Sequence, residues 1–175
     1  MLRRIFQVMH ALTAKMESSD HRLVTGNLDS REQSLFYAMD INSQKHSVKV
    51  ALTCLQLAAS YPLADRKLLV RAALLHDIGK QRGDLTTLDR IIFVITGKLF
   101  PRLSKALAKQ GNGFSRQKLQ HAFFVLEAHP VLGRQKAAAV GVEPQILELI
   151  ARHHTPQVPG EPLELTILRN ADDLN

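Results

Sequence analysis

Residues 72–80 read Ala-Ala-Leu-Leu-His-Asp-Ile-Gly-Lys, so an apolar helical stretch ends in an adjacent histidine and aspartate, His76 and Asp77. An ionised carboxylate at the end of an apolar face is costly to bury unless it has a partner. Metal coordination suits both side chains, because imidazole and carboxylate together ligate iron, manganese, zinc or nickel. The pair therefore predicts a metal site, provided that the rest of the chain supplies further ligands.

Further polar side chains stand at the ends of apolar stretches or inside them. They are His46, His129, His153, His154 and Asp172. Apolar residues 149–151 precede the histidine pair, and residues 167–168 precede the aspartate. Several such coincidences favour one shared partner, so we expect a metal site assembled from separate helices.

The chain is expected to be helical almost throughout. Apolar residues recur at three- and four-residue spacing, as in the first segment up to Met16, and strand-like alternation is scarce. Asp29 and Glu32 have the spacing of a capping box, and Asp40 or Asn42 can cap the next helix. We expect helices over about 30–39, 40–60, 64–75, 115–128, 129–140, 143–154 and 168–174. We predict a single all-α domain without repeats or linkers.

The sequence pattern is less decisive for secondary structure at two places. Residues 91–95 are five apolar residues in a row, for which we favour helix over buried strand, and Pro101 should kink or split that helix. Gly79 is expected to let the chain leave the helix that ends at His76.

Length and composition limit the class of protein. The chain has 175 residues, enough for one domain with its own core. Its single cysteine, Cys54, excludes an internal disulfide and is expected to be a small buried residue in a reducing compartment. The basic start of the chain lacks a long apolar core, and no run of 18 apolar residues occurs. We expect a cytoplasmic protein without a transmembrane segment.

The net charge of +7 is a regional feature. Residues 98–136 hold eight basic residues and one acidic residue, whereas the remainder of the chain holds 15 of each. A basic region beside a metal site suits a phosphate-bearing substrate, because clustered positive charge concentrates anions. A solvated helix face is the alternative interpretation.

The order of these elements resembles a known family. His46, then His-Asp-Ile-Gly-Lys at 76–80, then His129-Pro130 with Gly133, then His153-His154, then Asp172 is similar to the HD-domain metal-dependent phosphohydrolase superfamily. Within it, the chain resembles the HDIG type and is most similar to the HD-GYP phosphodiesterases, although it lacks their Gly-Tyr-Pro loop. The resemblance covers residues 42–175, so we expect one HD domain over 1–175 with a helical extension at 1–40 and an insertion at 84–110.

The resemblance implies roles for individual residues. His46, His76, Asp77 and Asp172 would hold one metal ion, and His129, His153 and His154 a second, with Asp77 bridging both. Two divalent transition metal ions are expected, iron or manganese first, with zinc, nickel or magnesium as alternatives. Such a pair binds a hydroxide between the ions and clamps phosphoryl oxygens.

Asp77 and Lys80 are the expected catalytic residues. Asp77 would help to orient the nucleophile, and Lys80 would face phosphate. A solvated cation at a helix C-terminus is the alternative role for Lys80. Arg134 is a weaker phosphate candidate, and His10, His21 and His121 match no element of the family.

The sequence departs from the HD-GYP pattern at three places. HD-GYP proteins carry a Gly-Tyr-Pro loop after the histidine pair, whereas this chain has residues 155–162, with three prolines and no tyrosine. Cyclic di-GMP is therefore not carried over as substrate. Asn42 stands where relatives with a third metal have glutamate, so no third metal is expected. The 84–110 insertion is expected to be a lid or a surface for a partner such as a second copy of the chain, rather than a membrane-touching helix.

We expect a phosphohydrolase that cleaves a phosphomonoester or phosphodiester of a nucleotide-type small molecule by a metal-activated hydroxide. The alternative is a regulatory HD domain that binds metal or nucleotide without turnover. A nucleic-acid-binding domain using 98–136 would leave the histidines unexplained, so nucleic acid is not an expected partner.

Overall fold

The computed structural model describes residues 15–84 and 116–175, with residues 89, 92, 96 and 102 between them. Over these residues the structure contains seven α-helices and no strand, which confirms the all-α prediction. The helices are α2 (Ser18–Asn27), α3 (Ser30–Ala38), α4 (Ile41–Ala58), α5 (Arg66–Leu75), α8 (Arg116–Ala139), α9 (Pro144–Arg152) and α10 (Leu163–Leu174). No helix among the described residues is long and apolar enough to cross a bilayer.

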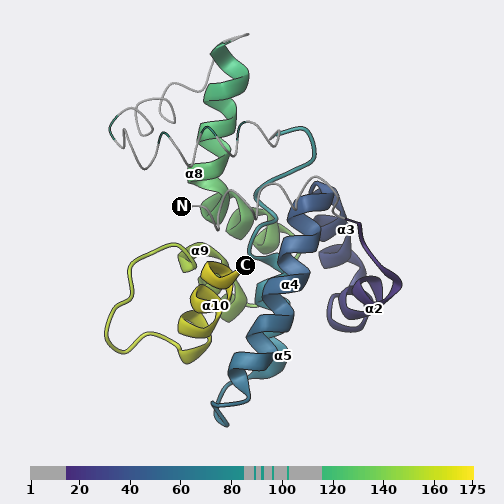
Figure 1. Cartoon of the computed structure of the whole chain (residues 1–175), viewed down its shortest axis with the longest axis vertical. Helices are drawn as coiled ribbons and strands as arrows, with labels where there is room; N and C mark the ends of the chain where they lie inside the picture. The colour runs from purple at the N-terminus through teal and green to yellow at the C-terminus, as the bar shows by residue number, and fades with distance from the viewer. Residues whose placement is uncertain (1–14, 85–88, 90–91, 93–95, 97–101, 103–115) are drawn as a thin grey trace.

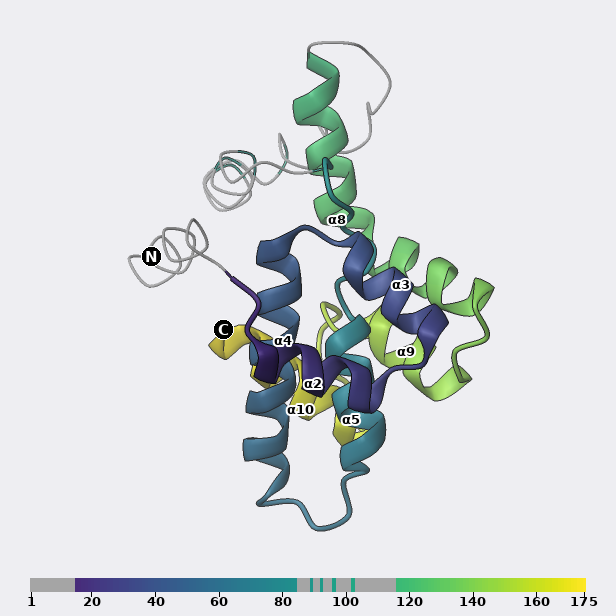
Figure 2. The same ribbon diagram turned by 90° about the vertical axis from the view of Figure 1, so that its right-hand side faces the viewer.

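The antiparallel helices α4 and α5 form the centre of the molecule. In Figure 1, α2 and α3 lie on one side of this pair and α10 on the other, while α8 stands above it. Figure 2 shows α2 crossing in front of the pair, while α3 lies to the side, near α8 and α9. The pair buries most of its apolar side chains, among them Val50, Leu69 and Leu74, each with no exposed surface. The core therefore lies between these central helices and their neighbours.

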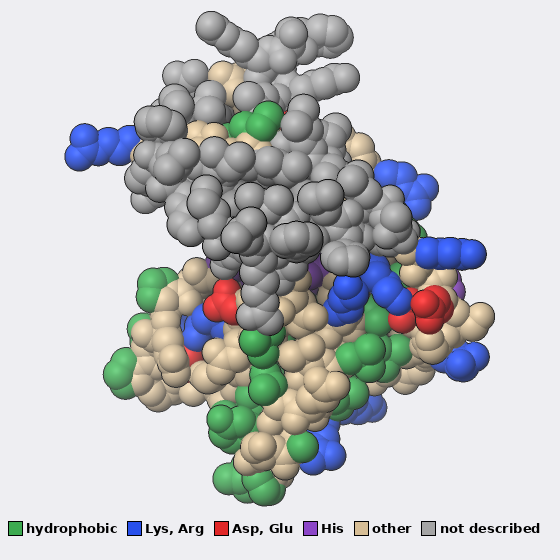
Figure 3. Space-filling model, in the orientation of Figure 1, with side chains coloured by type: hydrophobic (Ala, Val, Ile, Leu, Met, Phe, Trp, Pro, Cys, Tyr) green, Lys and Arg blue, Asp and Glu red, His purple; other side chains and the backbone are tan. Residues whose placement is uncertain are grey.

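The antiparallel pairing of α4 and α5 brings the polar positions together. His46 lies in the second turn of α4, and His76 directly follows the last residue of α5. The connecting loop is at the opposite end of the pair, where apolar side chains reach the surface (Figure 3) and Leu63 is 95% exposed. Residues 30 positions apart in the sequence thus become neighbours at the end away from this loop.

Side-chain caps begin the helices as the sequence predicts. Asp29 accepts from the backbone N–H groups of Arg31 and Glu32, and Glu32 accepts from the N–H of Asp29. Asp40, not Asn42, caps α4. Gly141 has φ +87°, the left-handed conformation that ends α8, and Pro144 occupies the first turn of α9.

Helix α8 corrects the prediction of two helices meeting at His129-Pro130. One helix runs through Pro130 from Arg116 to Ala139. A proline inside a helix lacks the N–H that would bond the carbonyl four residues earlier, here that of Leu126. His129 Nδ1 is 2.8 Å from that carbonyl oxygen and donates to it instead. Figure 2 shows α8 changing direction along its length, as expected for an interior proline.

The last helix is also longer than predicted. Helix α10 begins at Leu163 rather than near residue 168, because Leu165, Ile167 and Leu168 are buried on one helical face directly after Pro162. The expected N-terminal helical stripe before residue 15, the helix at 91–95, the kink at Pro101 and most of the 84–110 insertion lie outside the described residues.

A buried ion pair joins three parts of the fold. Arg71 on α5 donates to Glu32 on α3 and to Glu143 before α9, with N–O distances of 2.7 Å in both cases. Glu32 is 2% exposed, so its charge depends on Arg71 for compensation, whereas the Glu143 side chain is 52% exposed. Loss of the guanidinium would leave a buried carboxylate without its cation.

We predict that Arg71→Met lowers the free energy of unfolding by about 3 kcal/mol, because removing one partner of a buried pair leaves the other uncompensated. Glu143→Gln serves as the control and should cost less than about 1 kcal/mol, since that partner is exposed. Urea denaturation measures both. Equal small losses would show that the burial of Glu32 does not depend on Arg71.

Candidate metal centre

The predicted ligands come from five elements and converge at one buried point. His46 lies in α4 and Asp172 in α10, His76-Asp77 and His153-His154 follow α5 and α9, and His129 lies inside α8. Three of the imidazoles are nearly inaccessible: His76 is 1%, His129 2% and His153 0% exposed. Asp77 is 3% exposed, so the site includes a fully buried carboxylate.

One set of potential ligands consists of His46, His76 and Asp172. Their ligand atoms lie within 4.8 Å of one another. His46 Nε2 is 2.9 Å from Asp172 Oδ1, and His76 Nε2 is 3.7 Å from the same oxygen. The two imidazoles therefore face the same carboxylate from different helices.

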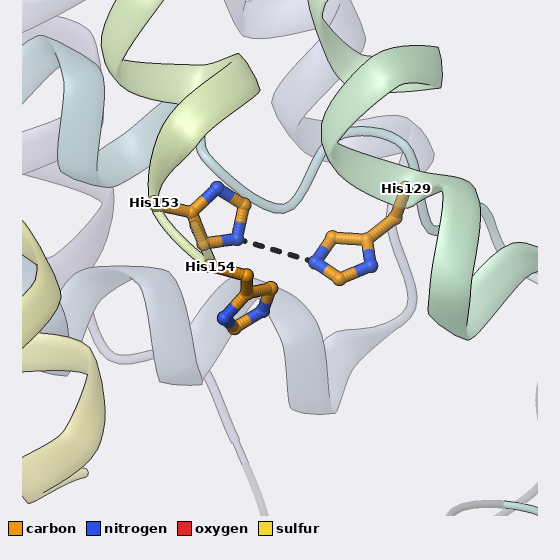
Figure 4. A group of neighbouring side chains, drawn as sticks. All are labelled: His129, His153 and His154. Atoms are coloured by element: carbon orange, nitrogen blue, oxygen red, sulfur yellow. Dashed lines mark hydrogen bonds between the residues drawn. The ribbon is translucent and has the colours of Figure 1, made fainter. Parts of the chain in front are cut away.

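A second set consists of His129, His153 and His154, which also lie within 4.8 Å of one another. Figure 4 shows the three rings gathered between α8 and the end of α9. The Nε2 atoms of His129 and His153 are 3.2 Å apart. His154 is the most open member, with a side chain that is 51% exposed, so this set is accessible from one side.

Asp77 lies between the two sets. Its Oδ1 atom is 3.6 Å from His76 Nε2 and 3.3 Å from His129 Nε2. It also forms a group of potential ligands with His76 and His153. The bridging role that the sequence resemblance implies for Asp77 remains a prediction.

Backbone carbonyls orient the three buried imidazoles in the same way. His76 Nδ1, His129 Nδ1 and His153 Nδ1 lie 2.7, 2.8 and 2.7 Å from the carbonyl oxygen three residues earlier. A carbonyl only accepts, so each Nδ1 carries the proton and donates it. The carbonyls that accept from His76 and His153 lie in the last turns of their helices, where no later backbone N–H of the helix is available to bond them. Each ring therefore turns its Nε2 atom towards the site.

These Nε2 atoms have no protein donor to satisfy them. His76 Nε2 is buried and lacks a hydrogen-bond partner, and the buried Asp77 Oδ1 pairs with the Lys80 ammonium at 2.7 Å. The Nε2 atoms of His129 and His153 face each other at 3.2 Å as two lone pairs, so direct bonding would require one ring to be charged. A cation placed among these atoms satisfies all of them at once. The residues present thus fit a divalent metal of the type that imidazole and carboxylate bind.

Protonation states also suit cation binding. Burial lowers the pKa of His129 and of His153 well below the usual histidine value, which keeps both rings neutral near pH 7. Burial raises the pKa of Asp77, but Lys80 and His76 outweigh it and hold that pKa well below its usual range. Burial likewise opposes ionisation of Asp172, whose pKa is nevertheless far below normal because His46 and His76 stabilise its charge. Burial also lowers the pKa of His76, but Asp77 and Asp172 outweigh it and raise that pKa. His129 and His153 thus offer neutral imidazoles, and Asp77 and Asp172 offer ionised carboxylates.

Lys80 lies at the edge of this centre. Its Nζ atom is 2.7 Å from Asp77 Oδ1, and its side chain is 13% exposed. Because Asp77 Oδ1 is also 3.3 Å from His129 Nε2, Lys80 lies beside the second ligand set, and its charge adds to burial in lowering the pKa of His129. Arg134, the weaker phosphate candidate, is exposed on α8.

Gly79 has a different role from the one predicted. Its φ is not in the left-handed region, so it is not needed for a helix exit. A Cβ at this position would stand 2.1 Å from the carbonyl oxygen of His129. Glycine allows the loop that carries Asp77 to lie directly on the backbone of α8, which brings Asp77 and His129 together.

The loop after the histidine pair is held at its far end. Glu161 accepts from Arg169 and from Thr166, so the 155–162 segment closes onto α10. Residues 154–160 are exposed. This confirms the predicted loop and leaves the exposed face of His154 beside it.

The other histidines lie outside the two ligand sets. His121 pairs with Asp84, and His21 with the hydroxyl of Tyr37, at 3.0 Å each, while His10 lies outside the described residues. Sequence reasoning missed the carbonyl of Leu126 as the group that orients His129. The signal was available, because Pro130 necessarily frees that carbonyl.

A family model for the HD domain matches residues 44–175, three quarters of the chain. This chain belongs to the HD-domain family. The match confirms the predicted membership of the metal-dependent phosphohydrolase superfamily, whose domains bind divalent metals. Searches of the curated proteins and of the solved structures found no match. The division of this HD domain into a core, an extension and an insertion remains a prediction.

We predict that Gly79→Ala displaces the Asp77 loop from α8, since the added methyl would overlap backbone that cannot move aside. Overpacking of this kind costs about 1 to 3 kcal/mol. Gly26→Ala is the matched control, because a Cβ there meets nothing within 4 Å and the residue lies in helix α2. Thermal unfolding should show a loss for the first variant and none for the second; equal melting temperatures would contradict the close approach.

Proposed function

We propose that this HD domain is a metal-dependent phosphohydrolase that cleaves a phosphomonoester or phosphodiester of a nucleotide-type small molecule. The ligands proposed for two divalent ions, iron or manganese first, are His46, His76, Asp77, His129, His153, His154 and Asp172. Asp77 and Lys80 are the proposed catalytic residues.

The observation that supports this proposal most strongly is a group of acceptors that face one another. His129 Nε2 and His153 Nε2 point at each other at 3.2 Å, and the buried Oδ1 atom of Asp77, which pairs with Lys80, lies 3.3 Å from His129 Nε2. Burial of the two facing imidazole nitrogens without a donor between them would cost free energy. A structural role in packing does not account for such an arrangement, whereas a shared cation does.

When bound, a pair of divalent ions would supply a nucleophile near neutral pH by lowering the pKa of water and would neutralise charge on the phosphoryl oxygens. The chain's own groups contribute orientation and charge. Asp77 holds an ionised carboxylate between the two ligand sets, where it can accept a proton from an attacking water. Its burial fixes that carboxylate in one position.

Lys80 supports phosphate as the reacting group. Its ammonium lies beside both Asp77 and the open ligand set, where it can donate to a phosphoryl oxygen. A phosphate approaching from the exposed side of His154 would meet this charge at the edge of the site. Lysine is a common point-charge ligand for phosphate.

The direct test is phosphate release and phosphodiester cleavage by protein loaded with Mn²⁺ or Fe²⁺, across nucleoside mono-, di- and triphosphates, cyclic nucleotides and cyclic dinucleotides. Turnover that disappears in Asp77→Asn supports the proposal. A nucleotide that binds but is recovered intact would favour the alternative, a regulatory HD domain. Neither binding nor turnover across the panel would contradict a nucleotide-type substrate.

We predict that Lys80→Met lowers kcat/KM by about 100-fold, since removing one donor to a developing negative charge has an effect of that order. Metal content should stay unchanged, because Lys80 has no lone pair to offer near pH 7. Lys67→Met, an exposed lysine in the first turn of α5, is the charge-matched control. If Lys80→Met instead lost metal in proportion to activity, Lys80 would act through Asp77 and not on the substrate.

A further inference from the structure

One lysine contacts the Asp77 loop from a different helix. Lys136 Nζ on α8 lies 3.4 Å from the carbonyl oxygens of both Ile78 and Gly79. The lysine is half-buried, and over the described residues no carboxylate lies within ion-pair distance of it. Its ammonium therefore donates to backbone carbonyls of the loop between Asp77 and Lys80.

Lys136 belongs to one face of α8 that receives this loop. His129, Gly133 and Lys136 are spaced four and three residues apart, so they lie on one side of the helix. The His129 backbone meets Gly79, and a Cβ on Gly133 would stand 3.3 Å from the backbone nitrogen of Gly79. Lys136 completes the contact one turn further along. The loop is thus in backbone contact at one end of this face and held by an ammonium group at the other.

A second contact holds the end of the same loop. Asp84 accepts from the backbone N–H of Gln81 at 2.8 Å and pairs with His121, which lies two turns before His129 on α8. Burial lowers the pKa of Lys136, and the Asp84 charge offsets part of that effect, so Asp84 acts on the same lysine. Residues 77–84 are therefore held at two separated points of one helix.

We propose that Lys136 is a positioning residue: it clamps the Ile78 and Gly79 carbonyls onto α8 and thereby fixes Asp77 and Lys80 relative to His129. Lys136 would thereby keep Asp77 Oδ1 at 3.3 Å from His129 Nε2. If the loop could shift by about an ångström, Asp77 would move away from His129, with which it is proposed to share a metal ion. The effect of Lys136 on metal binding rests on the proposed function, whereas its contact with the loop does not.

The first measurement needs no metal or substrate. In metal-free protein, Lys136→Met should increase amide hydrogen exchange in the peptide that spans residues 76–81 by about tenfold, because local opening becomes easier. The amides of Ile78 and Lys80 report it, since each donates to a backbone carbonyl. Lys67→Met is the charge-matched control and should leave this peptide unchanged. If Lys136→Met does not fold, Lys136→Gln, whose donor is one bond shorter, replaces it.

The second measurement is titration with Co²⁺ alone, followed by its visible absorption. Weaker binding by about 10- to 100-fold in Lys136→Met is expected for the loss of a group that orients ligands. Unchanged exchange overturns the clamp, and faster exchange with unchanged Co²⁺ affinity overturns its positioning role. Wild-type protein that binds no Co²⁺ would refute the proposed metal function, while the exchange experiment would still decide whether Lys136 holds the loop.

Discussion

The structure depends on one constraint: several unprotonated imidazole nitrogens and two ionised carboxylates are held together away from water. Each of the three buried imidazoles gives its proton to a carbonyl within its own turn. The lone pairs that remain all point to the same place. Without a cation, the lone pairs of His129 and His153 would repel across 3.2 Å, and the cost of burying the Asp77 charge would have to be offset by Lys80. A cation removes both costs, so the fold is organised around a binding site.

The helices arrange this site by their ends rather than by their faces. His76 and His153 occupy the C-cap positions of α5 and α9, where carbonyls are available to orient a ring. Pro130 creates the same condition inside α8 by removing one backbone donor, so His129 behaves as though it ended a helix. Gly79 then lets the Asp77 loop lie against that point. The same hydrogen bond, from an imidazole to the carbonyl three residues before it, occurs three times.

Much of this was readable in the sequence. The apolar stretch before His76-Asp77 and the capping box at Asp29 are local signals, and each predicted its element correctly. The order of the separated histidines and aspartates indicated the family. The exact start of α10 was missed, because burial against α4 extends that helix beyond the segment whose pattern was clearest.

The remaining features depend on contacts between segments far apart in the chain. The single path of α8 through Pro130 follows from a side-chain bond that substitutes for a backbone bond. The reason for Gly79 is the His129 backbone, 50 residues later. The sequence pattern does not single out Lys136, because a lysine in a basic segment is ordinarily a solvated cation. Its importance appears only when the Ile78 and Gly79 carbonyls are placed beside it.

The most direct test of the central claim is the metal content per chain after purification without a chelator. It should be measured in the wild-type protein, in His153→Ala, and in His21→Ala, a histidine that lies outside both ligand sets and pairs with Tyr37. The account predicts about two ions per chain in wild type, as in two-metal sites generally, unchanged in His21→Ala and falling towards one in His153→Ala. No metal in the wild type, or a content that His153→Ala leaves unchanged, would contradict it.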